Sequence, residues 1–128
     1  IMSSDWSSDV CSSDLRILSP HLDLKKAPGI FLAGQITGVE GYIESAACGL
    51  WLGLNLGRNV SLPPAETALG GLLNYLHEPR DNFQPMNVNF GLLPPIKRRM
   101  KKAKRKEAYV HRAQSALEEW MAGLGVDR

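Results

Sequence analysis

The chain has 128 residues, a hydrophobic fraction of 44% and a formal net charge of +2, which suit a single globular unit. No apolar run reaches the length of a membrane span, and the first residues lack the basic-then-apolar order of a secretory signal, so we expect no membrane partner. Cys11 and Cys48 form neither a disulfide framework nor a metal-ligand spacing, which predicts no metal site and a cytoplasmic location.

The first fifteen residues differ from the rest, because Ser-Ser-Asp occurs three times within them. One interpretation is a polar tail of low complexity. We prefer another, because residues 5–15 (DWSSDVCSSDL) resemble a translated sequencing-library adapter. Residues 1–15 are therefore set aside as non-native, and we expect the native sequence to begin near Arg16. Without Asp5, Asp9 and Asp14 the net charge rises to about +5.

After an extended lead-in punctuated by Pro20 and Pro28, the run Ile30–Ala33 has the length of a buried strand. It does not alternate apolar and polar residues, which favours a parallel sheet covered on both faces. Glycines at 34, 38 and 41 follow, and then a helix begins. A strand, a glycine-rich turn and a helix N-terminus in this order predict an α/β fold and can present backbone N–H groups to an anion or a polar ligand edge.

The expected helix spans about 42–57, and its apolar positions follow helical spacing: Ile43, Ala46, Ala47, Leu50, Trp51 and Leu54. Gly49, Gly53 and Gly57 recur every four residues, although each costs a helix about 1 kcal/mol against alanine. Two explanations remain open: close approach of another backbone or a cofactor, or tight packing of the helix on a sheet. Cys48 is expected to be a small buried hydrophobe.

A second helix is expected from Ala65 to His77, with Glu66 in its first turn and an apolar stripe of Ala68, Leu69, Leu72, Leu73 and Leu76. Alternation across residues 86–90 predicts a short strand or an extended segment on the core. The amides of this region, Asn82, Gln84, Asn87 and Asn89, either bind a substrate or satisfy local backbone groups.

A third helix is expected over about 96–122, and the run KRRMKKAKRK at 97–106 holds eight of the fifteen basic side chains. Such a run indicates either a nucleic-acid interface or a solvated helix end. It has no interleaved aromatic residue for base stacking, so contacts would be mainly with phosphates. The candidate RNA-binding residues are Lys97, Arg98, Arg99, Lys101, Lys102, Lys104 and Arg105.

Three blocks resemble one known family in the same order and at suitable spacing: AGQITGVEGYIESAACGL at 33–50, PPAETALG at 63–70 and NFQPMNVNFGLLPP at 82–95. The family is the bacterial FAD- and folate-dependent tRNA uracil-5-methyltransferases (TrmFO). A related wobble-uridine enzyme family, of the glucose-inhibited division protein A type, shares the strand, the Gly-Gln turn and the Gly-Tyr-x-Glu helix start. The Val-Glu-Gly-Tyr spelling and the Asn-Phe-Gln-Pro-Met-Asn block favour the methyltransferases.

The resemblance implies a C-terminal fragment of a Rossmann-like FAD-binding domain, followed by mainly helical C-terminal segments over residues 16–128. It implies FAD, methylenetetrahydrofolate as the methyl donor and NAD(P)H as the reductant. The implied product is 5-methyluridine in the T-loop of tRNA, so tRNA and folate are the expected partners. The positions that would contact the flavin are Gly34, Gln35, Thr37, Gly38, Val39, Gly41 and Tyr42.

The family's Gly-x-Gly-x-x-Gly and its catalytic cysteines do not match any residue of this chain, so we expect them upstream and expect no activity from the chain alone. Two alternatives stay open. One is a related flavoprotein that modifies the wobble uridine of tRNA or ribosomal RNA. The other is a non-enzymatic basic module that binds RNA. The sequence leaves the oligomeric state, the folate contacts and the target nucleotide open, and it predicts that the isolated chain aggregates or folds only in part.

Overall fold

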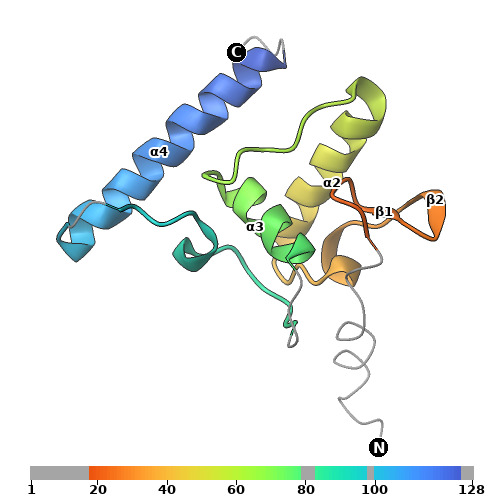
Figure 1. Cartoon of the computed structure of the whole chain (residues 1–128), viewed down its shortest axis with the longest axis horizontal. Coiled ribbons are helices and arrows are strands. Elements are labelled where there is room, and N and C mark those ends of the chain that lie inside the picture. Colours follow the sequence, from red (N-terminus) through yellow and green to blue (C-terminus); the bar gives the residue numbers. More distant parts are fainter. Residues whose placement is uncertain (1–17, 79–82, 98–99, 125–128) are drawn as a thin grey trace, which may run out of the picture.

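The computed structural model describes residues 18–78, 83–97 and 100–124, so the first fifteen residues, Arg98 and Arg99 lie outside it. The described chain mixes helices with a small sheet, in agreement with an α/β class (Figure 1). Its elements in order are β1 (Asp23–Leu24), β2 (Ala27–Phe31), the 3-10 helix η2 (Gly34–Thr37), α2 (Tyr42–Arg58), α3 (Ala68–His77), the 3-10 helix η3 (Phe90–Leu92) and α4 (Lys102–Gly123).

The strand before the glycines differs from the prediction. Within the described residues, β2 pairs antiparallel with β1, and Ile30 is 52% exposed. The expected parallel strand over Ile30–Ala33, buried on both faces, is therefore wrong. The chain turns back on itself at residues 25–26, so the partner strand is local, and a hairpin needs no crossover helix. The parallel pairing found in the described chain is a single bridge between Val39 and Met86.

Helix α2 has nearly the predicted bounds, but only part of the predicted stripe is buried. Trp51 is buried as predicted, together with Cys48, Leu52 and Asn55, whereas Ile43, Ala46 and Leu50 are exposed. The helix is apolar almost all round, so periodicity alone does not say which side meets the core. Two side chains secure its C-terminal end: Asn55 Nδ2 donates to the Val60 carbonyl at 2.6 Å, and Trp51 Nε1 donates to the Ser61 carbonyl at 3.3 Å.

Helix α3 begins three residues later than predicted because Thr67 caps it. The Thr67 side chain accepts a hydrogen bond from the Gly70 N–H at 3.0 Å, and the Thr67 N–H donates to the Pro64 carbonyl at 2.9 Å. Pro64–Thr67 therefore forms a turn, and Glu66 lies before the helix and not in its first turn. Leu72, Leu73 and Leu76 are buried as predicted, whereas Ala68 is exposed.

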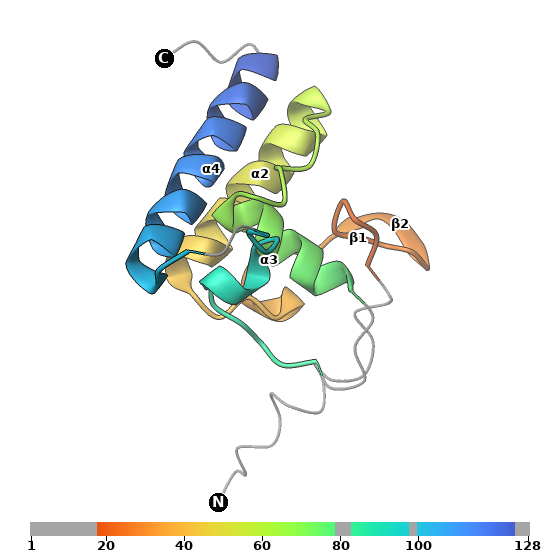
Figure 2. The same ribbon diagram turned by 60° about the vertical axis from the view of Figure 1, so that its left-hand side comes forward.

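The core lies where α3 crosses α2 (Figures 1 and 2). Trp51 of α2 is almost fully buried in this cluster. Residues from the connecting segments complete it, namely Leu18, Leu22, Val39 and Val60. Burial of these side chains is the main force that holds together the hairpin, the two helices and the segment Gly34–Gly41, which we call the glycine turn.

Helix α4 runs along the edge of the molecule (Figure 1) and starts at Lys102, so its expected start near residue 96 is wrong. Pro94 and Pro95 disfavour helix just upstream, and Lys101 is extended at the N-cap. Within the described residues, no side chain of α4 is fully buried. The helix is held by Trp120, whose Nε1 donates to Ser61 Oγ at 3.0 Å, and by Arg112, which donates to the Pro94 carbonyl.

Candidate functional site

The glycine turn is closed by its own hydrogen bonds. Gly34 has φ +80° and Gly38 has φ +89°, backbone angles that residues other than glycine rarely adopt. Thr37 is completely buried, and its Oγ1 donates to the Gly34 carbonyl at 2.7 Å. The Gly38 N–H donates to the Gln35 carbonyl at 3.0 Å. The turn therefore has one well-defined backbone shape, as a preorganised ligand site requires.

The segment from Phe83 to Val88 holds the turn from the side. The Met86 N–H donates to the Gly38 carbonyl at 2.9 Å, and the Glu40 N–H donates to the Met86 carbonyl at 3.3 Å. The Phe83 ring fills the space beside Gly38, because a Cβ built there would lie 2.4 Å from Phe83 Cζ. Two distant stretches of sequence thus form one unit. This confirms the predicted extended segment around Met86, although the strand is reduced to one bridge.

Glu44 links this segment to the start of α2. Its Oε1 accepts the Val88 N–H at 3.3 Å, and its carboxylate lies over Gly41, where a Cβ would be 1.8 Å from Oε2. Glu44 also lies in the first turn of α2, where a negative charge suits the helix dipole. The Glu44 side chain is therefore part of a polar network that orients α2 against the turn.

The seven predicted cofactor residues fall into two groups. Gln35 and Tyr42 are exposed, Tyr42 to 90%, and Gly41 is half-buried. These three can meet a ligand with side chains or backbone. The other four are buried and shape the turn: Gly34, Thr37, Gly38 and Val39. The backbone of Val39 pairs with Met86, and the Thr37 hydroxyl bonds within the turn. Both residues are buried, so neither side chain points into solvent.

Sequence reasoning missed two exposed apolar residues beside the turn. Ile36 is 65% exposed next to Gln35, and Ile43 is 84% exposed next to Tyr42. Exposed branched aliphatic residues at a polar turn suit a ligand with a flat apolar body and polar edges. It also missed the supporting roles of Phe83 and Met86, for which the apolar alternation of that block was the available signal.

The chemistry that this site offers is orientation and electrostatic stabilisation. No side-chain hydrogen bond caps the N-terminus of α2, but the Glu44 carboxylate lies over Gly41 and offsets part of the positive charge that the first-turn N–H groups and the helix dipole present there. Burial, followed by the nearby Glu44 charge, raises the pKa of Cys48 to about 11, so its thiol stays protonated near neutral pH. Cys48 is therefore a buried packing residue, as predicted, and not a nucleophile.

Among the amide side chains next to this unit, Asn89 makes local hydrogen bonds. Its Oδ1 accepts the Gly91 N–H at 2.9 Å, and its Nδ2 donates to the Asn87 carbonyl at 3.1 Å. This favours the structural explanation for Asn89 over substrate binding. Asn82 lies outside the described residues.

A basic surface lies at the start of α4. Lys101, Lys102, Lys104 and Arg105 are exposed there, and Lys97 is exposed just before the helix. The Lys106 ammonium lies 6.0 Å from the centroid of the Phe90 ring. The first turn has no acidic residue, so cations crowd the positive end of the helix dipole. This arrangement is destabilising by itself, and a bound anion such as a phosphate would relieve it. Arg98 and Arg99 lie outside the described residues.

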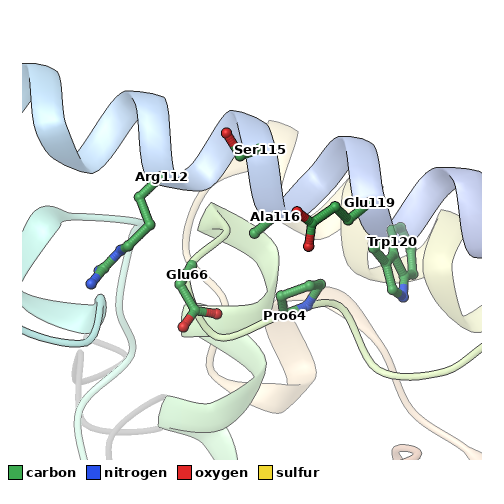
Figure 3. A pocket seen from close by; sticks show the side chains of 7 residues that line it. All are labelled: Pro64, Glu66, Arg112, Ser115, Ala116, Glu119 and Trp120. Carbon is green, nitrogen blue, oxygen red and sulfur yellow. The ribbon is translucent and has the colours of Figure 1, made fainter.

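A separate cleft of about 730 Å³ lies between α4 and the turn before α3 (Figure 3). Glu66, Arg112 and Glu119 line it together with Trp120, and they mix both signs of charge. Within the described chain Arg112 Nε has no hydrogen-bond partner.

No group of three histidine, cysteine or acidic side chains that could hold a metal ion is found among the described residues. No helix of the described chain is long and apolar enough to cross a bilayer.

Comparison with known proteins first defines a class. The family model described as "Glucose inhibited division protein A" matches residues 10–62, which include the hairpin, the glycine turn and α2. The site geometry described above therefore lies mostly within the segment that this class shares.

Closer relatives define the family. The protein of Nitratidesulfovibrio vulgaris (strain Hildenborough) named methylenetetrahydrofolate–tRNA-(uracil-5-)-methyltransferase TrmFO is 51% identical over 116 residues, which cover 87% of this chain and 24% of that protein. Proteins of the same name from Oleidesulfovibrio alaskensis and Syntrophotalea carbinolica are 48% and 52% identical, over 85% and 82% of this chain and 26% and 24% of their own lengths. The chain belongs to the TrmFO family, and it spans about a quarter of these relatives.

Proposed function

We propose that this chain supplies the flavin-contacting turn of an FAD- and methylenetetrahydrofolate-dependent enzyme that forms 5-methyluridine in the T-loop of tRNA. The observation that carries the proposal is the 51% identity over 116 residues to a protein named as a methylenetetrahydrofolate–tRNA-(uracil-5-)-methyltransferase. The proposal places the turn in a Rossmann-like FAD domain in the cytoplasm, with NAD(P)H as the reductant and tRNA and folate as substrates.

FAD, when bound, supplies the redox chemistry, and the chain positions it. Gln35 is exposed and can donate its amide to a hydroxyl of the ribityl chain. The first-turn N–H groups of α2 favour negative charge at the edge of the reduced ring, an effect that the Glu44 carboxylate over Gly41 offsets in part. The exposed Tyr42 ring, next to Ile43, packs against the flat face of a bound ring system.

The basic start of α4 is proposed to contact tRNA phosphates. Lys97, Lys101, Lys102, Lys104 and Arg105 are exposed on the described surface, and Arg98 and Arg99 belong to the same run of sequence. Phosphate contacts position an RNA without reading its sequence, so this surface contributes affinity that weakens as the salt concentration rises.

The test is a chimera in which residues 16–128 replace the aligned segment of the Nitratidesulfovibrio vulgaris relative. With methylenetetrahydrofolate, NAD(P)H and tRNA that lacks 5-methyluridine, the chimera should methylate the T-loop uridine. Cys48→Ala is the control and should keep this activity, because the thiol is buried and protonated.

A chimera that holds flavin but modifies only the wobble uridine or ribosomal RNA would support the related flavoproteins in place of this proposal. A folded chimera that binds RNA but holds no flavin would support a basic RNA-binding module. Both results contradict the proposal.

A further inference from the structure

One whole side of α2 is apolar and uncovered in the described chain. Ile43 is 84% exposed, Leu50 66% and Leu56 55%. Between Glu44 and Arg58 the helix carries no charged residue. We call the exposed residues Ile43, Gly49, Leu50, Gly53, Leu56 and Gly57 the outer face of α2. Apolar surface of this kind on a soluble protein usually marks an interaction site.

The glycines lie in the middle of this outer face. At 100° per residue, Gly49, Gly53 and Gly57 fall in one row, with Ile43 and Leu50 on one flank and Leu56 on the other. A Cβ added at any of the three would meet nothing within 4 Å. Packing inside the described chain therefore does not explain why glycine stands there, although three glycines cost the helix about 3 kcal/mol against alanine. Of the two explanations left open by the sequence, packing of this row on a sheet is not found among the described residues.

The shape of the outer face suits a closely packed polypeptide. A row of glycines with bulky apolar flanks lets a second backbone approach to short distance while its side chains pack on both sides. The absence of charge disfavours nucleic acid, which needs cations facing its phosphates. It also disfavours a charged peptide, whose groups would lose water without gaining a partner.

The comparisons say where such a polypeptide can come from. The relatives carry about three quarters of their length outside the segment that aligns with this chain. The outer face starts at Ile43, directly after the exposed Tyr42, the residue that follows the glycine turn. It also continues into a groove of about 300 Å³ lined by Ile43, Ala47, Ala68 and Val88 and by the Glu44 side chain, so a segment lying on α2 would reach α3 as well.

We propose that the outer face of α2 is the docking surface for a polypeptide segment from the part of TrmFO-family proteins that this chain does not cover. The segment packs backbone to backbone on the glycine row and fixes the direction of α2, and through α2 the position of the glycine turn. The glycine row lies on later turns of the helix than the flavin contacts proposed above, and Ile43 is the residue at which the two surfaces meet.

The test compares two glycine substitutions of the same kind. Gly53 and Gly123 are both exposed helical glycines with no atom within 4 Å of an added Cβ. Leucine favours helix over glycine by close to 1 kcal/mol, so neither Gly53→Leu nor Gly123→Leu should weaken its own helix. The chain is co-expressed with the remaining portion of the Nitratidesulfovibrio vulgaris relative, and the complex is purified through a tag on that portion.

The unsubstituted chain and Gly123→Leu should be retained equally, and Gly53→Leu should be retained on the order of ten-fold less. In the covalent chimera, Gly53→Leu should lower the melting midpoint and Gly123→Leu should not. Equal retention of the two variants, or no complex with the unsubstituted chain, overturns the proposal. Light scattering provides a further decisive outcome: if Gly53→Leu splits a dimer of this chain and leaves the mixed complex intact, the occupant is a second copy and the proposal is wrong.

Discussion

Gly38 is the residue on which the glycine turn depends most. Its backbone φ of +89° would be strained for any residue that carries a side chain. An added Cβ would lie 2.4 Å from the Phe83 ring and 3.8 Å from Leu76 Cδ2. We expect Gly38→Ala to destabilise the fold by about 2–4 kcal/mol, from backbone strain and overpacking together. The measurement is the melting midpoint of the chimera, with hydrogen exchange of the Phe83–Val88 amides as a local reading.

Gly29 is the matched control for this substitution. It has a similar φ of +93°, but a Cβ there meets nothing within 4 Å. Gly29→Ala should therefore cost only the backbone strain, about 1 kcal/mol. If the two substitutions cost the same, contact with Phe83 does not hold the turn and our description of the unit is wrong.

His77 makes the fold sensitive to acid. Burial lowers the pKa of His77 below its usual value, with smaller effects from Lys25 and His21, although a hydrogen bond to the Pro20 carbonyl at 3.1 Å acts in the opposite direction. A histidine whose pKa is lower in the folded chain takes up its proton more readily in the unfolded chain. Stability is then full above the unfolded pKa of about 6.5 and falls as the pH drops through that value towards the folded pKa.

We therefore expect the chimera to melt at a lower temperature near pH 5.5 than near pH 7.5, and His77→Gln to reduce this difference. His111→Gln, at an exposed position of α4, is the control and should leave the difference unchanged. A His77→Gln variant with the full acid sensitivity of the parent would show that other groups cause it.

At the scale of elements, the start of α3 depends on one hydroxyl. Thr67 is 5% exposed, and its Oγ1 accepts the Gly70 N–H and donates to the Pro64 carbonyl. Thr67→Ala should cost about 1–2 kcal/mol and increase hydrogen exchange in the first turn of α3, whereas Thr67→Ser should retain most of the stability. Equal losses for both variants would mean that the methyl group matters and the cap does not.

The elements also show what the sequence could predict. The existence of α2 and α3 follows from apolar spacing in the sequence. The start of α3 depended on recognising Thr67 as the cap behind Pro63 and Pro64. The pairing of β2 and the buried face of α2 were not predictable, because a short apolar run and an all-round apolar helix fit several partners equally well. For the same reason the supporting role of Phe83, a contact between distant parts of the chain, needed the structure.

The described part of the molecule has a buried core and an extended uncovered apolar side, the outer face of α2. The core between α2 and α3 positions the glycine turn, while the outer face of α2 remains in contact with water. An uncovered face of this kind favours self-association. Residues 16–128 alone should therefore aggregate or fold only in part, and a cooperative, reversible melt of this segment at high protein concentration would contradict that expectation.

The central claim is that the exposed edge of the glycine turn contacts a flavin, and Gln35 tests it most directly. The side chain of Gln35 is exposed, so Gln35→Glu changes charge and hydrogen bonding without disturbing the core. Gln114→Glu makes the same change at an exposed position of α4. The measurement is flavin absorbance per protein in the purified chimera. We predict that Gln35→Glu loses most of its flavin and Gln114→Glu keeps it; equal flavin content in the two variants would contradict the account.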